Sequence, residues 1–154
     1  MNPLVSELAR EFQDHTYRHS YVDEFLNTAI ASQIKALREQ RGWSQERLAQ
    51  ECGMKQSRIS LLENVDYSAW SIRTLKKLAE AFDVALTVKF ESFGLRVHDI
   101  ESFDVAALVV PSFNEDPIFK PMLQDISPVS VSTPSGIRES NEEVLKQFLT
   151  LGSL

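Results

Sequence analysis

The chain reads IKALREQRGWSQERLAQECGMKQSRISLLEN over residues 34–64, and these residues carry its clearest structural signals. Apolar residues recur at spacings of three and four until Gly42, a signal for the end of a long helix. Ser44 is placed to cap a second helix, which ends near the turn residue Gly53. A third, short helix is predicted over residues 56–63. The stretch therefore predicts two short helices joined by a tight turn and preceded by a long helix.

The third helix has one apolar and one polar side. At 100° per residue, Ile59, Leu62 and Glu63 cluster on the inner side. The polar outer side suits the major groove of DNA, where base edges pair with amide, ammonium and hydroxyl groups. The residues predicted to read bases are Lys55, Gln56, Ser57, Ser60 and Leu61. The residues predicted to contact phosphates, at the rim and at helix ends, are Gln45, Arg58 and Asn64.

The same stretch resembles the helix-turn-helix of the Cro and phage-repressor (XRE) type. The likeness rests on Ser44-Gln45-Glu46 with Leu48-Ala49 before the turn, and on Ile59, Ser60, Leu62, Glu63 and Asn64 after it. It covers about residues 30–90 and implies a five-helix domain that binds double-stranded DNA and regulates transcription. It also implies a structural ion pair between Arg38 and Glu63.

Two positions depart from this family pattern. Lys55 stands where the family places Ser or Thr, so the third helix lacks a capping oxygen. A lysine there is explained if its ammonium is needed near DNA. The family turn Asn-Gly is replaced by Asn64-Val65-Asp66-Tyr67, which changes the loop that follows the third helix.

After Asp83 the apolar period changes from 3.6 to 2, which predicts a strand over residues 85–91. A single strand needs a partner for its backbone groups, and a second copy of the chain is the simplest one. Residues 43–90 also resemble the antitoxin repressors of persistence-type toxin-antitoxin operons. That likeness implies a homodimer whose trailing strands pair with each other. The predicted dimerisation residues are Leu86, Val88 and Phe90.

The predicted fold is mostly α, in three parts. Residues 1–29 form an N-terminal helical extension, and residues 30–91 form the DNA-binding domain with its trailing strand. Residues 92–154 form an acidic tail rich in Pro and Ser, expected to be extended or disordered. Two features interrupt this tail, namely the apolar patch Val105 to Val110 and a closing helix from Glu139 to Leu149.

Charge is distributed unevenly along the 154 residues, whose net charge is −6. Residues 30–90 carry 10 basic and 7 acidic side chains, whereas residues 91–154 carry 4 and 10. The basic middle part fits a DNA partner despite the negative total. The acidic tail fits a protein partner on which it folds.

Several classes of function are disfavoured. No nucleophile, phosphate loop or metal cluster occurs at usable spacing, so neither an enzyme nor a bound cofactor or metal is expected. His15, His19 and Asp23 share one helix face, but a solvated surface explains them better than a metal site. The single Cys52 is expected to pack in the core. No apolar run is long enough for a membrane span, so a cytoplasmic protein is expected.

The sequence therefore predicts a homodimeric transcriptional regulator, a repressor, that binds a palindromic operator. The alternative is an antitoxin that also binds a toxin through its tail, its N-terminal helices or the flank of the domain. Two other hypotheses stay open: a helical domain used for protein contacts alone, and a tail in which residues 105–110 and 113–119 fold back over the strand pair.

Overall fold

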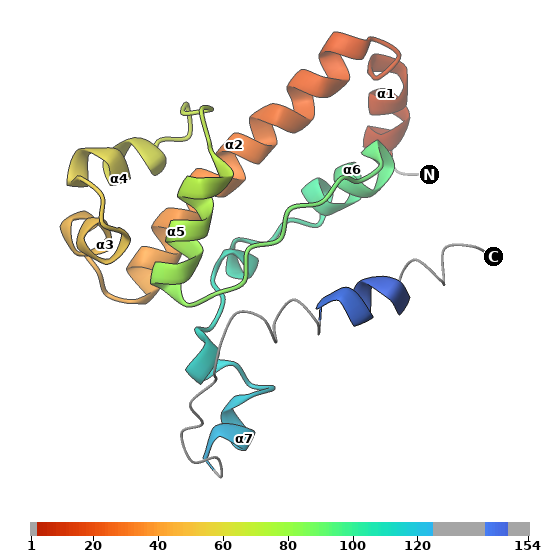
Figure 1. Ribbon diagram of the computed structural model, residues 1–154. Helices are drawn as coiled ribbons and strands as arrows, with labels where there is room; N and C mark the ends of the chain where they lie inside the picture. The colour runs from red at the N-terminus through yellow and green to blue at the C-terminus, as the bar shows by residue number, and fades with distance from the viewer. Residues whose placement is uncertain (1–2, 125–140, 148–154) are drawn as a thin grey trace.

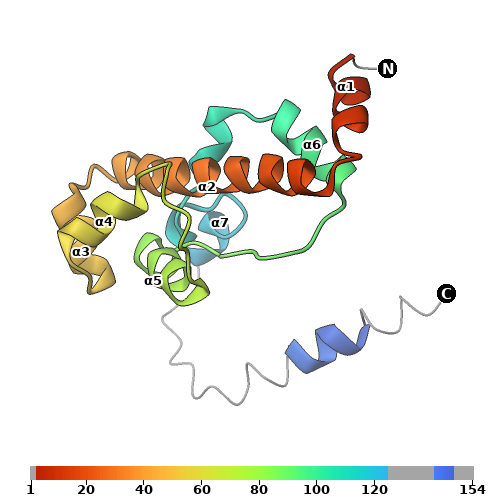
Figure 2. The ribbon, with the colours of Figure 1, turned by 90° about the horizontal axis from the view of Figure 1, so that it is seen from above.

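The structure is a computed structural model that describes residues 3–124 and 141–147. Its helices are α1 (Pro3–Glu11), α2 (His15–Gln40), α3 (Gln45–Cys52), α4 (Gln56–Leu62), α5 (Ile72–Phe82), α6 (Phe93–Glu101) and α7 (Lys120–Leu123), with the 3-10 turns η1 (Val105–Leu108) and η2 (Phe113–Glu115). Residues 141–147 are also helical. The long helix α2 organises the molecule: α3, α4 and α5 gather around its C-terminal half, while α1 and α6 lie at its other end (Figures 1 and 2).

The helices α3 and α5 each begin at a serine that caps the first turn with its side chain. The Ser44 hydroxyl accepts a hydrogen bond from the backbone N–H of Arg47 at 3.1 Å, and Ser71 does the same for Thr74 at 3.1 Å. Gly53 ends α3 in the left-handed conformation, with φ at 60°. The predicted cap at Ser44 and the predicted turn at Gly53 are therefore confirmed.

We expect Gly53→Ala to destabilise the fold by about 1–2 kcal/mol, because a Cβ disfavours the left-handed conformation. A Cβ at Gly53 would meet no atom within 4 Å, so the cost is backbone strain rather than a clash. Gly94 is the matched control, since it lies inside α6 and also has open space around it. Gly94→Ala should stabilise by about 0.5–1 kcal/mol. Urea unfolding of both variants measures the two changes in the free energy of unfolding. If both variants were destabilised or both stabilised by the same amount, the claim that Gly53 is needed for its left-handed conformation would be contradicted.

The core joins α2, α3, α4 and α5. Its buried members are Ile34, Leu37, Leu48, Ala49, Cys52, Ile59, Leu62, Leu78 and Phe82. The ring of Trp43 stacks on Phe82, with centroids 6.1 Å apart. Burial raises the pKa of the Cys52 thiol to about 11, which keeps it neutral and unreactive at ordinary pH. Cys52 therefore belongs to the core, as predicted.

The predicted trailing strand is wrong. Across residues 3–124 and 141–147 there is no β-strand, and residues 85–91 form an extended connector between α5 and α6 that makes no backbone hydrogen bond within those ranges. Leu86, Val88 and Phe90 are exposed on this connector, and Phe90 is fully exposed. Alternating apolar residues favour an extended backbone, but a strand also requires a neighbouring strand for its ladder. The strand on which the predicted dimerisation role of these three residues depended is therefore absent from the described residues.

The predicted count of five helices is also wrong. Residues 30–83, all of them described, contain only the end of α2 followed by α3, α4 and α5. The helix α5 ends at Asp83, whose φ of 55° is left-handed, and the chain then runs extended. The next helix, α6, begins only at Phe93, where Ser92 caps it by accepting the backbone N–H of Leu95 at 3.3 Å. The left-handed Asp83 ends α5, and residues 84–92 between it and α6 contain no helix.

An extended or disordered tail is the wrong description for residues 93–108. Val97 of α6 and Leu108 of η1 are buried. The side-chain amide of Gln33 on α2 donates to the carbonyl of Leu108 at 3.3 Å, and Phe25 of α2 meets Phe103 edge-on at 5.4 Å. The patch at residues 105–110 therefore folds onto α2 instead of onto a strand pair.

Part of the predicted tail lies outside the described residues. The predicted closing helix is confirmed for residues 141–147, and its remaining residues are not described. The Ser/Thr/Pro-rich run from Ser127 to Ser135 is likewise outside the described residues. In the part of the chain that is described, every helix is too short or too polar to cross a membrane.

Candidate nucleic-acid interface

The helix α4 is held against α3 by its inner side. Ile59 and Leu62 are both 0% exposed and pack with Leu48 and Ala49 of α3. A helix of seven residues would not persist alone in water, so this packing fixes its position. The outer side of α4 is consequently presented as a rigid surface.

All five residues predicted to read bases are exposed at α4. Of the residues predicted to contact phosphates, Asn64 is exposed, while Gln45 and Arg58 are partly buried. Lys55 occupies the N-cap position of α4 and makes no side-chain capping bond, because an ammonium cannot accept a hydrogen bond from a backbone N–H. The predicted dimerisation residues lie in the connector before α6 and do not join this surface.

Four polar side chains form a side-chain relay that ends on the outer face of α4. The Arg38 guanidinium of α2 forms two hydrogen bonds with the Glu63 carboxylate, one of them 3.0 Å from Nη2 to Oε2. The Gln45 amide donates from Nε2 to the same Oε2 at 2.9 Å. The Gln56 amide donates from Nε2 to Oε1 of Gln45 at 2.8 Å. The predicted pair of Arg38 and Glu63 is thus present and supports the two glutamines.

The relay determines which way each amide faces. An ionised carboxylate only accepts hydrogen bonds, so Glu63 requires the nitrogen of Gln45. The oxygen of Gln45 then faces Gln56 and requires the nitrogen of Gln56. One N–H and the oxygen of Gln56 remain available, which is the donor and acceptor pair that adenine N7 and N6 require. The sequence predicted Gln45 as a phosphate contact because it lies at a helix end. The structure adds its hydrogen bond with Gln56.

The base of the relay is anchored in the protein. Nη1 of Arg38 donates to the carbonyl of Trp43 at 2.8 Å. The hydrogen bonds with Glu63 raise the pKa of Arg38 above its usual value. A permanently charged guanidinium therefore sits beneath Glu63.

Sequence reasoning missed the residue that holds Arg58. Its guanidinium carbon lies 5.2 Å from the centroid of the Tyr67 ring, in the loop that replaces the family's Asn-Gly turn. In that loop Asn64 accepts the backbone N–H of Asp66 on its side-chain oxygen at 3.0 Å. An aromatic residue close after a helix that carries Arg was the available signal.

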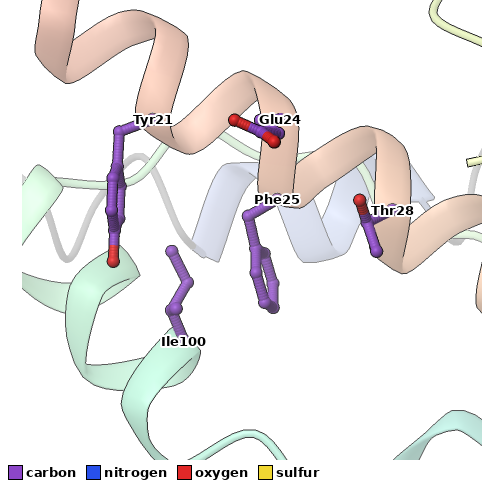
Figure 3. Close-up of a pocket in the computed structure, with 5 residues that line it drawn as sticks. All are labelled: Tyr21, Glu24, Phe25, Thr28 and Ile100. Atoms are coloured by element: carbon purple, nitrogen blue, oxygen red, sulfur yellow. The ribbon is translucent and has the colours of Figure 1, made fainter. Parts of the chain in front are cut away.

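A separate pocket of about 270 Å³ lies between α2 and α6 (Figure 3). Its lining residues are Tyr21, Glu24, Phe25, Thr28 and Ile100. They include no cation, so the pocket is unsuited to phosphate, and it lies at the other end of α2 from the α3–α4 pair. Among the described residues no three His, Cys, Asp or Glu side chains are grouped to hold a metal ion.

Two short helices at a glycine turn, the second one exposing a polar face, define a helix-turn-helix module. A helix-turn-helix family model matches residues 34–89. The antitoxin HipB of Escherichia coli O6:H1 is 34% identical over 69 residues, which span 45% of this chain and 72% of HipB. HipB of Escherichia coli K12 is 33% identical over 69 residues, spanning 45% and 77%. A hypothetical transcription factor of Neisseria meningitidis is 30% identical over 63 residues, spanning 41% and 58%. The chain belongs to the XRE-type helix-turn-helix family and is a DNA-binding transcriptional regulator.

Proposed function

We propose that the protein is a repressor without enzymatic activity that binds a palindromic operator as a homodimer. The relay from Arg38 to Gln56 carries this proposal, because it orients a side-chain amide on the exposed face of a rigid helix. A fixed donor and acceptor pair is what sequence reading in the major groove requires.

Each exposed residue of α4 has a matching partner in the groove. Gln56 pairs with adenine through its free N–H and oxygen, and Lys55 donates to guanine. The hydroxyl groups of Ser57 and Ser60 bond to either base, and Leu61 contacts a thymine methyl group. Gln45, Arg58 and Asn64 contact the flanking phosphates.

The homodimer is supported by the size of the reading surface. A seven-residue α4 reaches only a few base pairs, so one copy specifies too short a site to be selective. Two copies related by a two-fold axis place their helices in successive major grooves, about 34 Å apart. We assign no interface to the connector between α5 and α6.

The variant Lys55→Ser tests the proposal through two opposite effects. A serine supplies the missing cap of α4, so the free energy of unfolding should rise by about 0.5–1 kcal/mol. The loss of the ammonium should weaken operator binding by about tenfold. Ser44→Ala is the matched control, because it removes an existing cap from α3 and should destabilise by about 1 kcal/mol. Unfolding and DNA titration at fixed salt measure both effects. A stabilised Lys55→Ser variant with unchanged DNA binding would remove Lys55 from the reading surface.

A second proposal is that the protein acts as an antitoxin that also represses its own operon. Its support is the similarity to two HipB antitoxins across 72% and 77% of their lengths. The acidic C-terminal part, with 10 acidic and 4 basic side chains over residues 91–154, is the part we assign to the toxin. Co-expression with the product of the adjacent gene, followed by size-exclusion chromatography, tests it. A stable complex and relief of toxicity are expected, and a lone gene without a co-purifying partner would refute the proposal.

A further inference from the structure

Arg58 differs from Arg38 and Arg41 in the use of its N–H groups. Those of Arg38 bond to Glu63 and Trp43, and those of Arg41 bond to the carbonyls of Leu37 and Phe82. The Arg58 guanidinium lies 5.2 Å from the Tyr67 ring, and among the described residues no protein acceptor bonds to it. The Tyr67 ring therefore holds Arg58 in place, while the N–H groups of Arg58 can still donate hydrogen bonds to another molecule.

The Tyr67 ring is itself fixed by three contacts. Its hydroxyl donates to the carbonyl of Ala69 at 2.7 Å, and its backbone N–H donates to the carbonyl of Asn64 at 3.0 Å. The ring meets Trp70 edge-on, with centroids 5.2 Å apart and planes at 76°. Both rings pack against the core, so Tyr67 is a rigid support.

A guanidinium that lies over an aromatic face can keep its N–H donors free for a planar, bidentate acceptor. Arg58 lies at the rim of the reading face of α4, two residues from Gln56 and Ser60. The acceptors that DNA offers beside the groove are phosphate oxygens. A preordered guanidinium there loses little side-chain entropy on binding.

We propose that Tyr67 is a positioning residue for DNA binding: its ring holds the Arg58 guanidinium for a bidentate contact with a backbone phosphate beside the groove read by α4. This inference rests on the proposed function and deepens it. The alternative role of the stack is structural, tying the loop after α4 to the helix without any effect on DNA.

A double-mutant cycle in the full-length chain separates these roles. Arg58→Gln should weaken operator binding about tenfold. It should also reduce the slope of log K against log salt by about 1.8, because the dimer loses one phosphate contact, worth about 0.9, in each half-site. Tyr67→Leu should weaken binding by about two- to fivefold when Arg58 is present, and should add nothing in the Arg58→Gln background. Tyr67→Phe keeps the ring and should bind like the wild type.

Arg96→Gln is the matched charge control. The Arg96 guanidinium carbon lies 5.0 Å from the Phe25 ring, and α6 is remote from α4. This variant removes the same charge from the same kind of stack, and the salt slope should stay unchanged. Urea unfolding of every variant, carried out at the temperature of the DNA titrations, shows whether each variant is folded there.

Two results would overturn the inference. One is an unchanged salt slope for Arg58→Gln, and the other is an equal loss on Tyr67→Leu in both backgrounds. Gln56→Ala distinguishes this failure from failure of the proposed function. Suppose that Gln56→Ala loses the preference at one adenine in each half-site while Arg58→Gln leaves the slope unchanged: only the role of Tyr67 is then removed. If Gln56→Ala keeps the preference at every position, the proposed reading role of α4 is removed instead.

Discussion

Glu63→Ala is expected to lower the free energy of unfolding by about 3–5 kcal/mol. The Glu63 side chain is 5% exposed and the Arg38 side chain 11%, so both charges are removed from water. Without the carboxylate, the Arg38 guanidinium stays charged and largely buried, with only the Trp43 carbonyl and the exposed carboxylate of Glu39, 3.6 Å away, as partners. Gln45 also loses the acceptor for its Nε2. Chemical denaturation measures the loss.

The matched control is the exposed pair of Arg47 and Glu51, four residues apart on α3. Glu51→Ala should cost less than about 1 kcal/mol, because water replaces the partner of an exposed charge. A Glu63→Ala variant that unfolds like Glu51→Ala would contradict the claim that the relay is built on a desolvated ion pair.

Phe82→Ala is expected to destabilise by about 3–5 kcal/mol. The Phe82 side chain is among the largest fully buried ones and closes the core at the end of α5. Trp43 stacks on its ring, and the Arg41 guanidinium carbon lies 5.2 Å from its centroid. Removal of the ring leaves a cavity that two large neighbours line but do not fill. Thermal unfolding checks this: the midpoint temperature of Phe82→Ala should lie below that of the wild type.

Phe90→Ala is the matched control, because it makes the same substitution at an exposed position. Phe90 is 106% exposed on the connector between α5 and α6, so its loss should change stability by less than about 0.5 kcal/mol. A comparable loss in both variants would mean that Phe90 is covered by a contact within or between chains, and would contradict the described position of the connector.

The helix-turn-helix could be predicted from sequence because its signals are local. The cap Ser44 and the turn residue Gly53 act within one turn of helix, and Ile59 and Leu62 repeat at the spacing of a buried face. The pair of Arg38 and Glu63 was implied by family resemblance, and the structure contains it. The polar face of α4 follows from the same periodicity.

The features that could not be predicted depend on distant parts of the chain. Alternation at residues 85–91 favours an extended backbone, yet the presence of a strand is decided by a partner, which the described residues do not supply. The helix α6 is a different case, because its cap Ser92 was a readable local signal that the Pro-rich composition from Pro111 onward outweighed. Gln45 and Gln56 are 11 residues apart, so their contact emerges only when α3 and α4 pack.

Selection of bound sites from a random duplex pool, with the wild-type chain and Gln56→Ala at one salt concentration, tests the central claim most directly. We predict that the wild type enriches a palindrome whose half-sites lie about 34 Å apart. Gln56→Ala should lose the preference at one adenine in each half-site and keep the rest. Enrichment of no sequence by the wild type, or of the same sequence by both proteins, would contradict the assignment of α4 as the reading helix.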